Sequence, residues 1–274
     1  MPELPEVETI TNALRPCLCG QQIKNIEIFS PAMRTPLTPL LNPELRGMEI
    51  TEVYRRGRYT IIKLEKNFVL LLHYGMSGVV RMVEQDEKRR KHEHVSMNLA
   101  NGRALRFECT RRFSIFEVHQ LEDGRRYPAV LDDLGLEPLS EEFTGEYLFK
   151  ALTLRRGALK SAIMDNGIVV GIGNIYAAES LFEARLSPLR SANTLNLAEC
   201  EKLVAAAKRI LTEAIAVGGT TIHDYRQVDG SEGKFVNNLK IYGREGERCP
   251  VCGSIIEQCR IGGRSSCYCP GCQK

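Results

Sequence analysis

The sequence predicts an α+β chain of more than one domain: an N-terminal helix and short strands, then a helical part, then a small cysteine-rich module. Three observations support this prediction. Short apolar runs separated by turn residues fill positions 22–119. After Asp123-Gly124 the strand pattern changes to helical spacing of apolar residues. Two Cys-x-x-Cys pairs close the chain.

The first ten residues favour a helix start, with Pro5 in the first turn and Glu6 near the positive end of the helix dipole. They also suggest chemistry. We hypothesise that Met1 is removed, which leaves Pro2 as a secondary amine at the chain terminus. An α-amino group titrates near pH ~8, so part of it is unprotonated at neutral pH. Such an amine can attack an aldehyde-type carbon, and Glu3 could serve as its acid/base partner.

The segment after this helix reads as strands joined by tight turns. Tyr59–Leu64 and Phe68–His73 are apolar runs joined at Lys66-Asn67. Val95–Leu99 and Leu105–Phe107 flank Asn101-Gly102, a dipeptide that favours a hairpin turn with two positive φ angles. The pattern predicts a two-sheet sandwich or a flattened barrel, with the first helix packed across it.

Helices dominate the part that follows. Leu197–Val217 carries one apolar stripe, begins at a capping-box pair, Asn196 and Glu199, and stops at Gly218-Gly219. A domain boundary is expected near Leu134–Leu139. Shorter helices are expected at Glu141–Thr153, Gly157–Asp165 and Asn174–Leu186.

Composition sets broad limits on function. At 274 residues, with 43% hydrophobic and 26% charged residues, the chain suits two modest domains of ordinary globular character. The longest apolar runs are too short to span a bilayer, and no secretory leader precedes the fold. We therefore expect a cytoplasmic protein. The net charge of +3 lies entirely within residues 226–274 and is too small to identify a nucleic-acid partner by itself.

Four of the ten cysteines form two Cys-x-x-Cys pairs separated by sixteen residues. Four thiolates at this spacing typically form a closed tetrahedral site for one structural zinc ion, with no open position for catalysis. The expected ligands are Cys249, Cys252, Cys269 and Cys272. The other six cysteines are scattered, as free thiols are in a reducing compartment.

The glycine-rich stretch 165–176 runs into a predicted helix. Free N–H groups at a helix start can bind phosphate, although a tight helix–helix turn explains the glycines equally well. The Gly171-x-Gly173 fragment is too little for a dinucleotide fingerprint.

Eight motifs together give the chain a resemblance to the formamidopyrimidine-DNA glycosylases, in family order and over essentially its whole length. The motifs are PELPEVE at the N-terminus, HYGMSG, KHEH, LGLEPLS, VVGIGNIYAAESLF, GGTT, IYGREGE and GRSSCYCPGCQK. The resemblance implies removal of oxidised purines from DNA and nicking of the abasic strand. It implies three domains: a catalytic β-sandwich at 1–134, a helix–two-turn–helix domain at 135–224, and a lesion loop with a zinc finger at 225–274. The expected partner is damaged duplex DNA, bound by a monomer associated with the nucleoid.

The resemblance also implies roles for single residues. Pro2 attacks the sugar C1′ after the damaged base is flipped out, Glu3 protonates the opened sugar, and Glu6 supports the site. A wedge fills the vacated stack and contacts the orphan cytosine; it consists of Met76, Arg111 and Phe113. Phosphates are held by His92, Arg155, Lys160, Asn174, Tyr242 and Arg264, and His73 is a further DNA-binding residue. Arg264 also assists the second elimination, and the zinc stiffens the hairpin that carries it.

Three places depart from the family pattern. Arg58 stands where the family usually has a catalytic lysine, and arginine keeps the charge but hardly releases a proton at neutral pH. Cys109-Thr110 replaces Asp-Pro before Arg111, and Ser114 replaces a glycine. Two other functions therefore stay open: an endonuclease VIII-like enzyme for oxidised pyrimidines, and a non-catalytic binder of damaged DNA. The PELPEVE start argues against the first of these.

Overall fold

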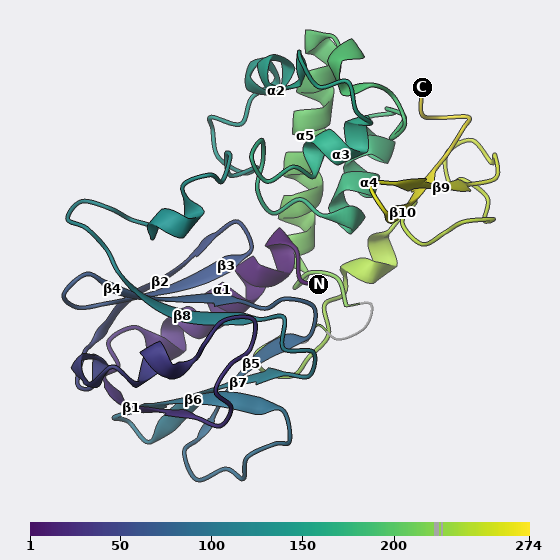
Figure 1. Cartoon of the computed structure of the whole chain (residues 1–274). Helices are drawn as coiled ribbons and strands as arrows, with labels where there is room; N and C mark the ends of the chain where they lie inside the picture. Colours follow the sequence, from purple (N-terminus) through teal and green to yellow (C-terminus); the bar gives the residue numbers. More distant parts are fainter. Residues whose placement is uncertain (222–224, 226) are drawn as a thin grey trace. The chain divides into compact units, whose positions relative to one another are not determined.

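The computed structural model describes residues 1–221, 225 and 227–274 (Figure 1). The chain divides into two compact units. The first unit comprises residues 1–132 and 218–234, and the second comprises residues 133–217 and 235–274. Residues 218–234 are therefore separated in sequence from the rest of the first unit by most of the second. None of the helices in the described part of the chain combines the length and the apolar character that a membrane span requires.

The first unit contains two four-stranded antiparallel sheets, in the orders β2-β3-β4-β8 and β1-β6-β7-β5. This arrangement confirms the two-sheet sandwich. The strands are β1 Ile23–Ile28, β2 Ile50–Arg56, β3 Tyr59–Leu64, β4 Phe68–His73, β5 Gly78–Glu84, β6 Glu93–Leu99, β7 Arg103–Cys109 and β8 Ile115–Gln120. Short 3-10 helices also occur in this unit, at Thr38–Leu41, Pro43–Leu45 and Ala129–Leu131.

Helix α1, Leu4–Leu18, packs into the sandwich core as the sequence predicts. Its buried face is formed by Val7, Ile10, Leu14 and Leu18, whose spacing repeats with the helical period. These side chains share one apolar cluster with residues from both sheets, such as Leu70 of β4. The rigid core therefore fixes the position of the chain's first residues.

The turn chemistry differs from the prediction. The dipeptide Asn101-Gly102 predicts two positive φ angles, but in the structure only Gly102 has one, at 87°. The amide of Gly102 donates to the carbonyl of Leu99, so the loop is one residue longer than a two-residue turn. Gly102 alone takes the left-handed conformation. The turn with two positive φ angles is Lys66-Asn67, at 52° and 59°. Asparagine tolerates this conformation without needing glycine beside it.

The second unit contains the predicted helices, with shorter bounds. They are α2 Gly145–Leu152, α3 Leu159–Ile163, α4 Asn174–Glu183 and α5 Leu197–Ala216. The capping box of α5 is confirmed, because Asn196 and Glu199 exchange two hydrogen bonds of 2.9 Å. Gly218 and Gly219, with φ angles of 81° and 78°, end the helix as predicted. Helix α2 begins later than expected because the Thr144 hydroxyl caps it by accepting from the amide of Tyr147.

The cysteine-rich end forms a two-stranded ribbon, β9 Glu257–Ile261 and β10 Arg264–Tyr268. The two strands are joined by Gly262-Gly263, both with positive φ. A small apolar cluster supports the ribbon, in which Ile256 packs with Phe182 of α4. The second unit also has 3-10 helices at Ala192–Thr194 and Phe235–Asn238.

Candidate functional site

The start of α1 holds two acidic side chains that are almost fully buried. Glu3 is 4% exposed and Glu6 is 2% exposed. Oxygen Oε2 of Glu6 accepts a hydrogen bond from the backbone nitrogen of Glu3 at 2.8 Å, within the capping box of the helix. Pro2, directly before this pair, is also buried, and Met1 is half exposed. The helix start therefore places the candidate amine next to a fixed carboxylate pair.

The second carboxylate oxygen of Glu6 binds the segment that follows α5, at Thr220. Its Oε1 accepts a hydrogen bond from the amide of Thr220 at 2.7 Å. Gly219 passes so close that a Cβ there would lie 2.7 Å from this oxygen. The Tyr225 hydroxyl donates to the carbonyl of Gly218 at 3.1 Å, and burial raises the pKa of Tyr225. Sequence reasoning noted the GGTT motif but missed this contact, for which the paired glycines were the available signal.

Arg58 and His73 lie together at one end of the β2-β3-β4-β8 sheet. Arg58 is in the turn after β2, and His73 pairs with Tyr59 across β3 and β4, with ring centroids 4.9 Å apart. Burial lowers the pKa of His73 to about 4, and the positive charges of Arg58 and Arg34 act in the same direction. His73 is therefore neutral at pH 7. Because its Nδ1 accepts from the amide of Gly75 at 3.2 Å, Nε2 carries the proton and can act as a hydrogen-bond donor.

The three wedge candidates meet on two adjoining loops of the first unit. Met76 is 41% exposed and Phe113 is 50% exposed, which is unusual for large apolar side chains. The guanidinium of Arg111 lies over the Phe113 ring, 5.3 Å from its centroid. The loops touch through their backbones: a Cβ on Gly75 would lie 2.7 Å from the carbonyl of Phe113. The exposed side chains of Met76 and Phe113 and the guanidinium of Arg111 therefore lie together on the surface of the first unit.

Two of the residues that depart from the family pattern, Cys109 and Ser114, are buried beneath these loops and bind them through hydrogen bonds. The Ser114 hydroxyl donates to the carbonyl of Tyr74 at 2.7 Å and also contacts the Cys109 sulfur at 3.0 Å. Ser77 in turn accepts from the amide of Arg111 at 3.2 Å. Cys109 and Ser114 are both fully buried. The two substitutions therefore contact each other and tie the Arg111 loop to the loop that carries Met76.

His92 lies at the same strand ends. It precedes β6 and is half-buried. Its carbonyl accepts from the amide of Cys109 at 2.9 Å, one residue before the loop that holds Arg111. The first unit therefore brings His92 next to the wedge candidates.

In the second unit, two phosphate candidates converge on the ribbon. Lys160 of α3 is 1% exposed, and its ammonium donates to the Ser266 hydroxyl at 2.8 Å. Asn174, the first residue of α4, donates from Nδ2 to the carbonyl of Ser265 at 3.1 Å. Its Oδ1 is buried without a hydrogen-bond partner in the described part of the chain. The family resemblance predicts phosphate contacts for these two residues, and the structure shows that both bind the ribbon.

Arg155 and Tyr242 make other contacts within the second unit. Arg155 is exposed and forms an ion pair with Asp165 at 3.1 Å. Tyr242 is half-buried in the segment before the ribbon, and its amide donates to Oε1 of Glu179 at 2.9 Å. Glu179 is a residue that sequence reasoning missed. It is 3% exposed in the middle of α4, and a carboxylate within the apolar string AAESLF was the available signal.

Glu179 binds three successive backbone amides. Besides that of Tyr242, its carboxylate accepts from Lys240 at 3.0 and 3.2 Å and from Ile241 at 3.0 Å. Consecutive N–H groups that converge on one anion form a nest, which here is filled by a side chain of the same chain. The nest fixes the segment between the Phe235–Asn238 helix and the ribbon.

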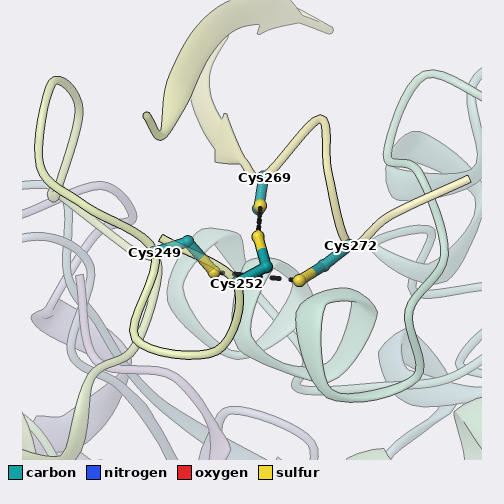
Figure 2. A group of neighbouring side chains, drawn as sticks. All are labelled: Cys249, Cys252, Cys269 and Cys272. Atoms are coloured by element: carbon teal, nitrogen blue, oxygen red, sulfur yellow. Dashed lines mark hydrogen bonds between the residues drawn. The ribbon is translucent and has the colours of Figure 1, made fainter. Parts of the chain in front are cut away.

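The four expected metal ligands form one cluster, drawn in Figure 2 with the sulfur atoms directed toward one another. All four sulfurs lie within 4.8 Å of one another, with 3.8 Å from Cys249 to Cys272 and 3.4 Å from Cys252 to Cys269. A tetrahedral zinc with Zn–S bonds of ~2.3 Å needs sulfurs roughly 3.8 Å apart, so the donor set fits a zinc ion. Arg264, exposed beside the turn of the ribbon, is carried by the strand that leads to Cys269.

Three sequence models of known domains match the chain. The formamidopyrimidine-DNA glycosylase N-terminal domain matches residues 1–116, and the formamidopyrimidine-DNA glycosylase H2TH domain matches residues 134–226. The zinc finger found in FPG and IleRS matches residues 246–274. The formamidopyrimidine-DNA glycosylases of Laribacter hongkongensis and Dichelobacter nodosus are 44% and 42% identical to the chain, with all of each protein covered.

Solved structures agree with these matches. A Lactococcus lactis FPG mutant in complex with DNA that contains Fapy-dG has a TM-score of 0.91 at 34% identity, with 100% of both chains covered. The MutM (FPG) protein from Thermus thermophilus has a TM-score of 0.86 at 40% identity, covering 99% of this chain and 98% of that one. A further Lactococcus lactis Fpg complex, with DNA containing an abasic site, has a TM-score of 0.89 at 33% identity and covers 99% of both chains.

Proposed function

The chain belongs to the formamidopyrimidine-DNA glycosylase family, and we propose that it removes oxidised purines from duplex DNA and then cleaves the abasic strand. The observation that carries this function is the match over the full length of the chain to relatives of that name, with Pro2 and Glu3 at its start. The substrates are 8-oxoguanine and formamidopyrimidine lesions. Related proteins have been crystallised with DNA containing Fapy-dG and with DNA containing an abasic site.

The chemistry begins at the N-terminus once Met1 is removed. The nitrogen of Pro2 bonds to C1′ of the flipped nucleotide as the bond from C1′ to the damaged base breaks. Glu3 donates a proton to the sugar oxygen as the ring opens, and a cationic Schiff base remains on Pro2. Loss of a C2′ proton then expels the 3′ phosphate, and a second elimination, assisted by Arg264, expels the 5′ phosphate. Glu6 holds Glu3 and Thr220 in place through its two hydrogen bonds.

The remaining site residues grip the duplex. Met76, Arg111 and Phe113 fill the space left by the flipped nucleotide, for which their exposure suits them. Backbone phosphates are contacted by His92, Arg155, Lys160, Asn174, Tyr242 and Arg264, and His73 contributes a further contact to the DNA. The structural zinc orders the ribbon that supports Arg264. The three-part division at 134 and 224 separates the catalytic, helix–two-turn–helix and zinc-finger functions. A repair enzyme acts where DNA lies, so the proposal includes association with the nucleoid in the cytoplasm.

The experiment that tests this function most directly blocks the N-terminal amine of Pro2. An N-terminal extension that cannot be processed is expected to abolish base excision and strand cleavage, because no free secondary amine is formed, while lesion binding persists. Borohydride trapping on an abasic duplex measures the Schiff base directly. Trapping of the processed chain excludes a non-catalytic binder. Equal cleavage by the extended chain would show that Pro2 is not the nucleophile. A panel of purine and pyrimidine lesions in matched duplexes distinguishes the proposed specificity from an endonuclease VIII-like one.

Arg58 is the place where the lyase step is expected to differ from that of most relatives. A guanidinium keeps charge-assisted hydrogen bonds to phosphate but does not transfer protons near pH 7. Proton transfer by a placed side chain contributes about 10²–10⁴-fold. We therefore expect Arg58→Lys to speed β-elimination on a pre-formed abasic site with little change in affinity. Single-turnover nicking measures this, and equal rates would assign Arg58 to positioning alone.

A further inference from the structure

The segment 85–92 crosses one sheet of the first unit from end to end. Strands β5 and β6 both flank β7 and are both antiparallel to it, so β5 and β6 run parallel to each other. The segment between them must therefore cross β7 on one face of the sheet. It contains four successive basic residues, Lys88-Arg89-Arg90-Lys91, followed by His92. We call Lys88–Lys91 the basic segment.

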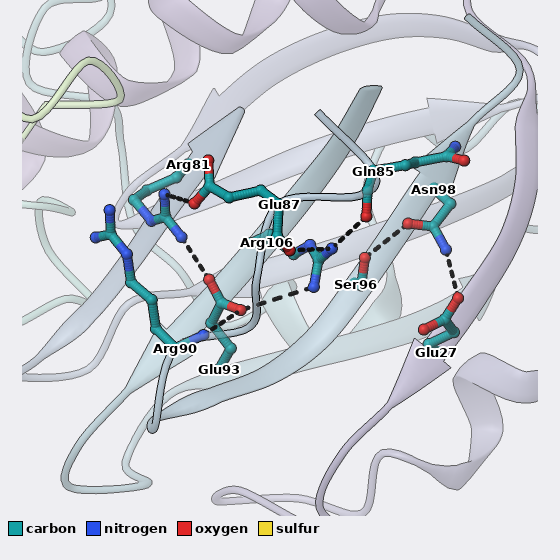
Figure 3. Close-up of polar contacts among 9 residues, drawn as sticks. All are labelled: Glu27, Arg81, Gln85, Glu87, Arg90, Glu93, Ser96, Asn98 and Arg106. Atoms are coloured by element: carbon teal, nitrogen blue, oxygen red, sulfur yellow. Dashed lines mark hydrogen bonds and ion pairs between the residues drawn. The ribbon is translucent and has the colours of Figure 1, made fainter. Parts of the chain in front are cut away.

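Two arginines of the sheet pair with Glu87 of this crossing and with Glu93, the first residue of β6 (Figure 3). Arg81 of β5 binds Glu87 at 2.8 Å and Glu93 at 2.5 Å. Arg106 of β7 lies 3.7 Å from Glu93 and donates to the carbonyl of Gln85 at 2.8 Å. Glu93 is 3% exposed, so these contacts form the fixed base of the crossing. Asp86 is the other acidic residue within it and is exposed.

Because the arginines of the sheet take up Glu87 and Glu93, the cations of the basic segment are left facing solvent. All four are exposed. Among the residues that the structure describes, none of the four side chains forms an ion pair. The guanidinium of Arg89 stacks over the Phe29 ring at 4.8 Å. Arg90 binds Glu93 only through its backbone nitrogen, and its guanidinium extends away from that carboxylate in Figure 3.

The basic segment leads to the end of the sheet that carries the wedge candidates. In the register of β5 and β7, Gly78 pairs with Cys109, so the loops of Met76 and Arg111 leave from this end. In the register of β6 and β7, Glu93 pairs with Glu108, so the crossing arrives at the same end. His92 joins the two regions through the hydrogen bond from the amide of Cys109.

We propose that the basic segment Lys88–Lys91 binds the phosphate backbone of duplex DNA beyond the lesion, without reading sequence or damage. Four exposed cations on a segment that is tied to the sheet by the Glu93 carboxylate and the Arg106 guanidinium suit a polyanion of fixed spacing. Displacement of counterions supplies the binding free energy. The proposal rests on the proposed function, because it takes the neighbouring wedge loops to face DNA. Its role is to hold the enzyme on undamaged duplex during the search for lesions, and it makes no contact with the reacting sugar.

The test compares two variants with the same change in net charge. Lys88→Gln/Arg90→Gln/Lys91→Gln removes three cations of the basic segment and leaves the stacked Arg89 in place. Arg46→Gln/Lys63→Gln/Lys66→Gln removes three cations near the opposite strand ends of the first unit. The affinity of each protein for undamaged and lesion duplexes is measured over a range of salt concentrations. Single-turnover excision at saturating enzyme is measured in parallel.

The slope of log K against log salt falls by about 0.9 for each phosphate that the protein no longer neutralises, so the first variant should lose roughly 2–3 from its slope. The decrease should be equal on undamaged and lesion duplexes, and the single-turnover rate should not change. The control variant should keep the parent slope. Equal slopes in all three proteins, an equal decrease in the control, or a decrease confined to the lesion duplex would overturn the proposal. Failure of the parent to bind or excise would instead contradict the proposed function.

Discussion

Each unit contains one helix glutamate that is almost fully buried and binds backbone amides from a distant segment, but the two carboxylates are used differently. Glu6 of α1 gives one oxygen to the amide of Glu3 in its own helix and the other to Thr220. Glu179 of α4 gives its carboxylate to three successive amides, Lys240 to Tyr242. Glu6 therefore links two separate segments, whereas Glu179 fills one nest.

The difference indicates what each unit needs from its glutamate. The first unit has a large apolar core that holds α1 in place, so Glu6 is available to position Glu3 and residues 218–220. The ribbon of the second unit rests on a much smaller cluster. It depends on Glu179 and on the cysteine site for its order. The first carboxylate should therefore matter most for catalysis, and the second for stability.

Zinc removal should give the largest effect and should be confined to the second unit. Structural zinc in small modules supplies roughly 10–16 kcal/mol of apparent binding free energy, which is also folding free energy. Chelation, or Cys269→Ser, should remove amide protection from β9 and β10 and weaken DNA binding, while the first unit stays folded. Hydrogen exchange and binding titration measure both. Cys259→Ser, in β9 but outside the cluster, is the matched control. An unchanged dissociation constant after verified metal loss would contradict this prediction.

Apolar replacement of the two glutamates tests the comparison directly. Glu179→Leu leaves three amides without an acceptor, of which that of Ile241 is buried and the other two are part-buried, and Glu6→Leu leaves two buried amides. Each buried amide left unpaired costs about 1–3 kcal/mol. Glu179→Leu should be the more destabilising change and should expose amides 240–242 to exchange. Glu6→Leu should lose base excision while lesion binding persists. The reverse pattern, with catalysis more sensitive at Glu179, would show that the two roles are wrongly assigned.

Lowering the pH from 6.5 toward 4 should destabilise the first unit through His73, which lies in β4. The pKa of His73 is about 4 in the folded chain and 6.5 when unperturbed, so the unfolded state binds more protons between these values. Stability from this group is complete above pH 6.5 and is lost as pH falls toward 4, by up to about 3 kcal/mol. His73→Gln should reduce this loss, measured by urea unfolding with amide exchange in β4.

Replacement of the two glutamates by glutamine should have the smallest effect on the free energy of unfolding. The cost should nevertheless differ clearly between Glu6 and Glu179. At Glu179, one oxygen already accepts from all three amides, so a glutamine carbonyl can keep these contacts and lose mainly the charge. At Glu6, each oxygen faces a different amide, so either orientation of glutamine sets an NH₂ group against an N–H group. Glu6→Gln should cost about 1–3 kcal/mol and Glu179→Gln less than about 1 kcal/mol. Equal costs of the two substitutions would contradict the distinction between Glu6, which links two segments, and Glu179, which fills one nest.

Much of this arrangement could be predicted from the sequence where the signal is local. The α5 capping box and the edges of β3 and β4 depend on spacing within a few residues. The cysteine pairs likewise predicted a cluster that the structure contains. The hairpin at Asn101-Gly102 is confirmed, but its expected pair of positive φ angles was wrong, because loop length and strand register decide which residue takes the positive φ.

Contacts between distant segments could not be predicted in this way. Nothing near Glu6 in the sequence indicates that its partner is Thr220, and nothing near Glu179 indicates residues 240–242. The contact of Ser114 with Cys109 became visible only once both loops were placed. Motif resemblance supplied residue identities at these places, but the physical reason for each pairing lies in the tertiary structure.

The hydrogen bond from Thr220 to Glu6 has a consequence for how the protein is made. Its two ends are 214 residues apart in the chain. At about 5–20 residues per second, the ribosome adds the second end roughly 10–40 s after the first. The sandwich can condense early, since its strands are all complete by residue 120. The carboxylate beside the reactive amine must wait for its partner until the whole of α5 has been synthesised. The N-terminal residues of the proposed active site are thus synthesised first, but their hydrogen bonding is completed only late in synthesis.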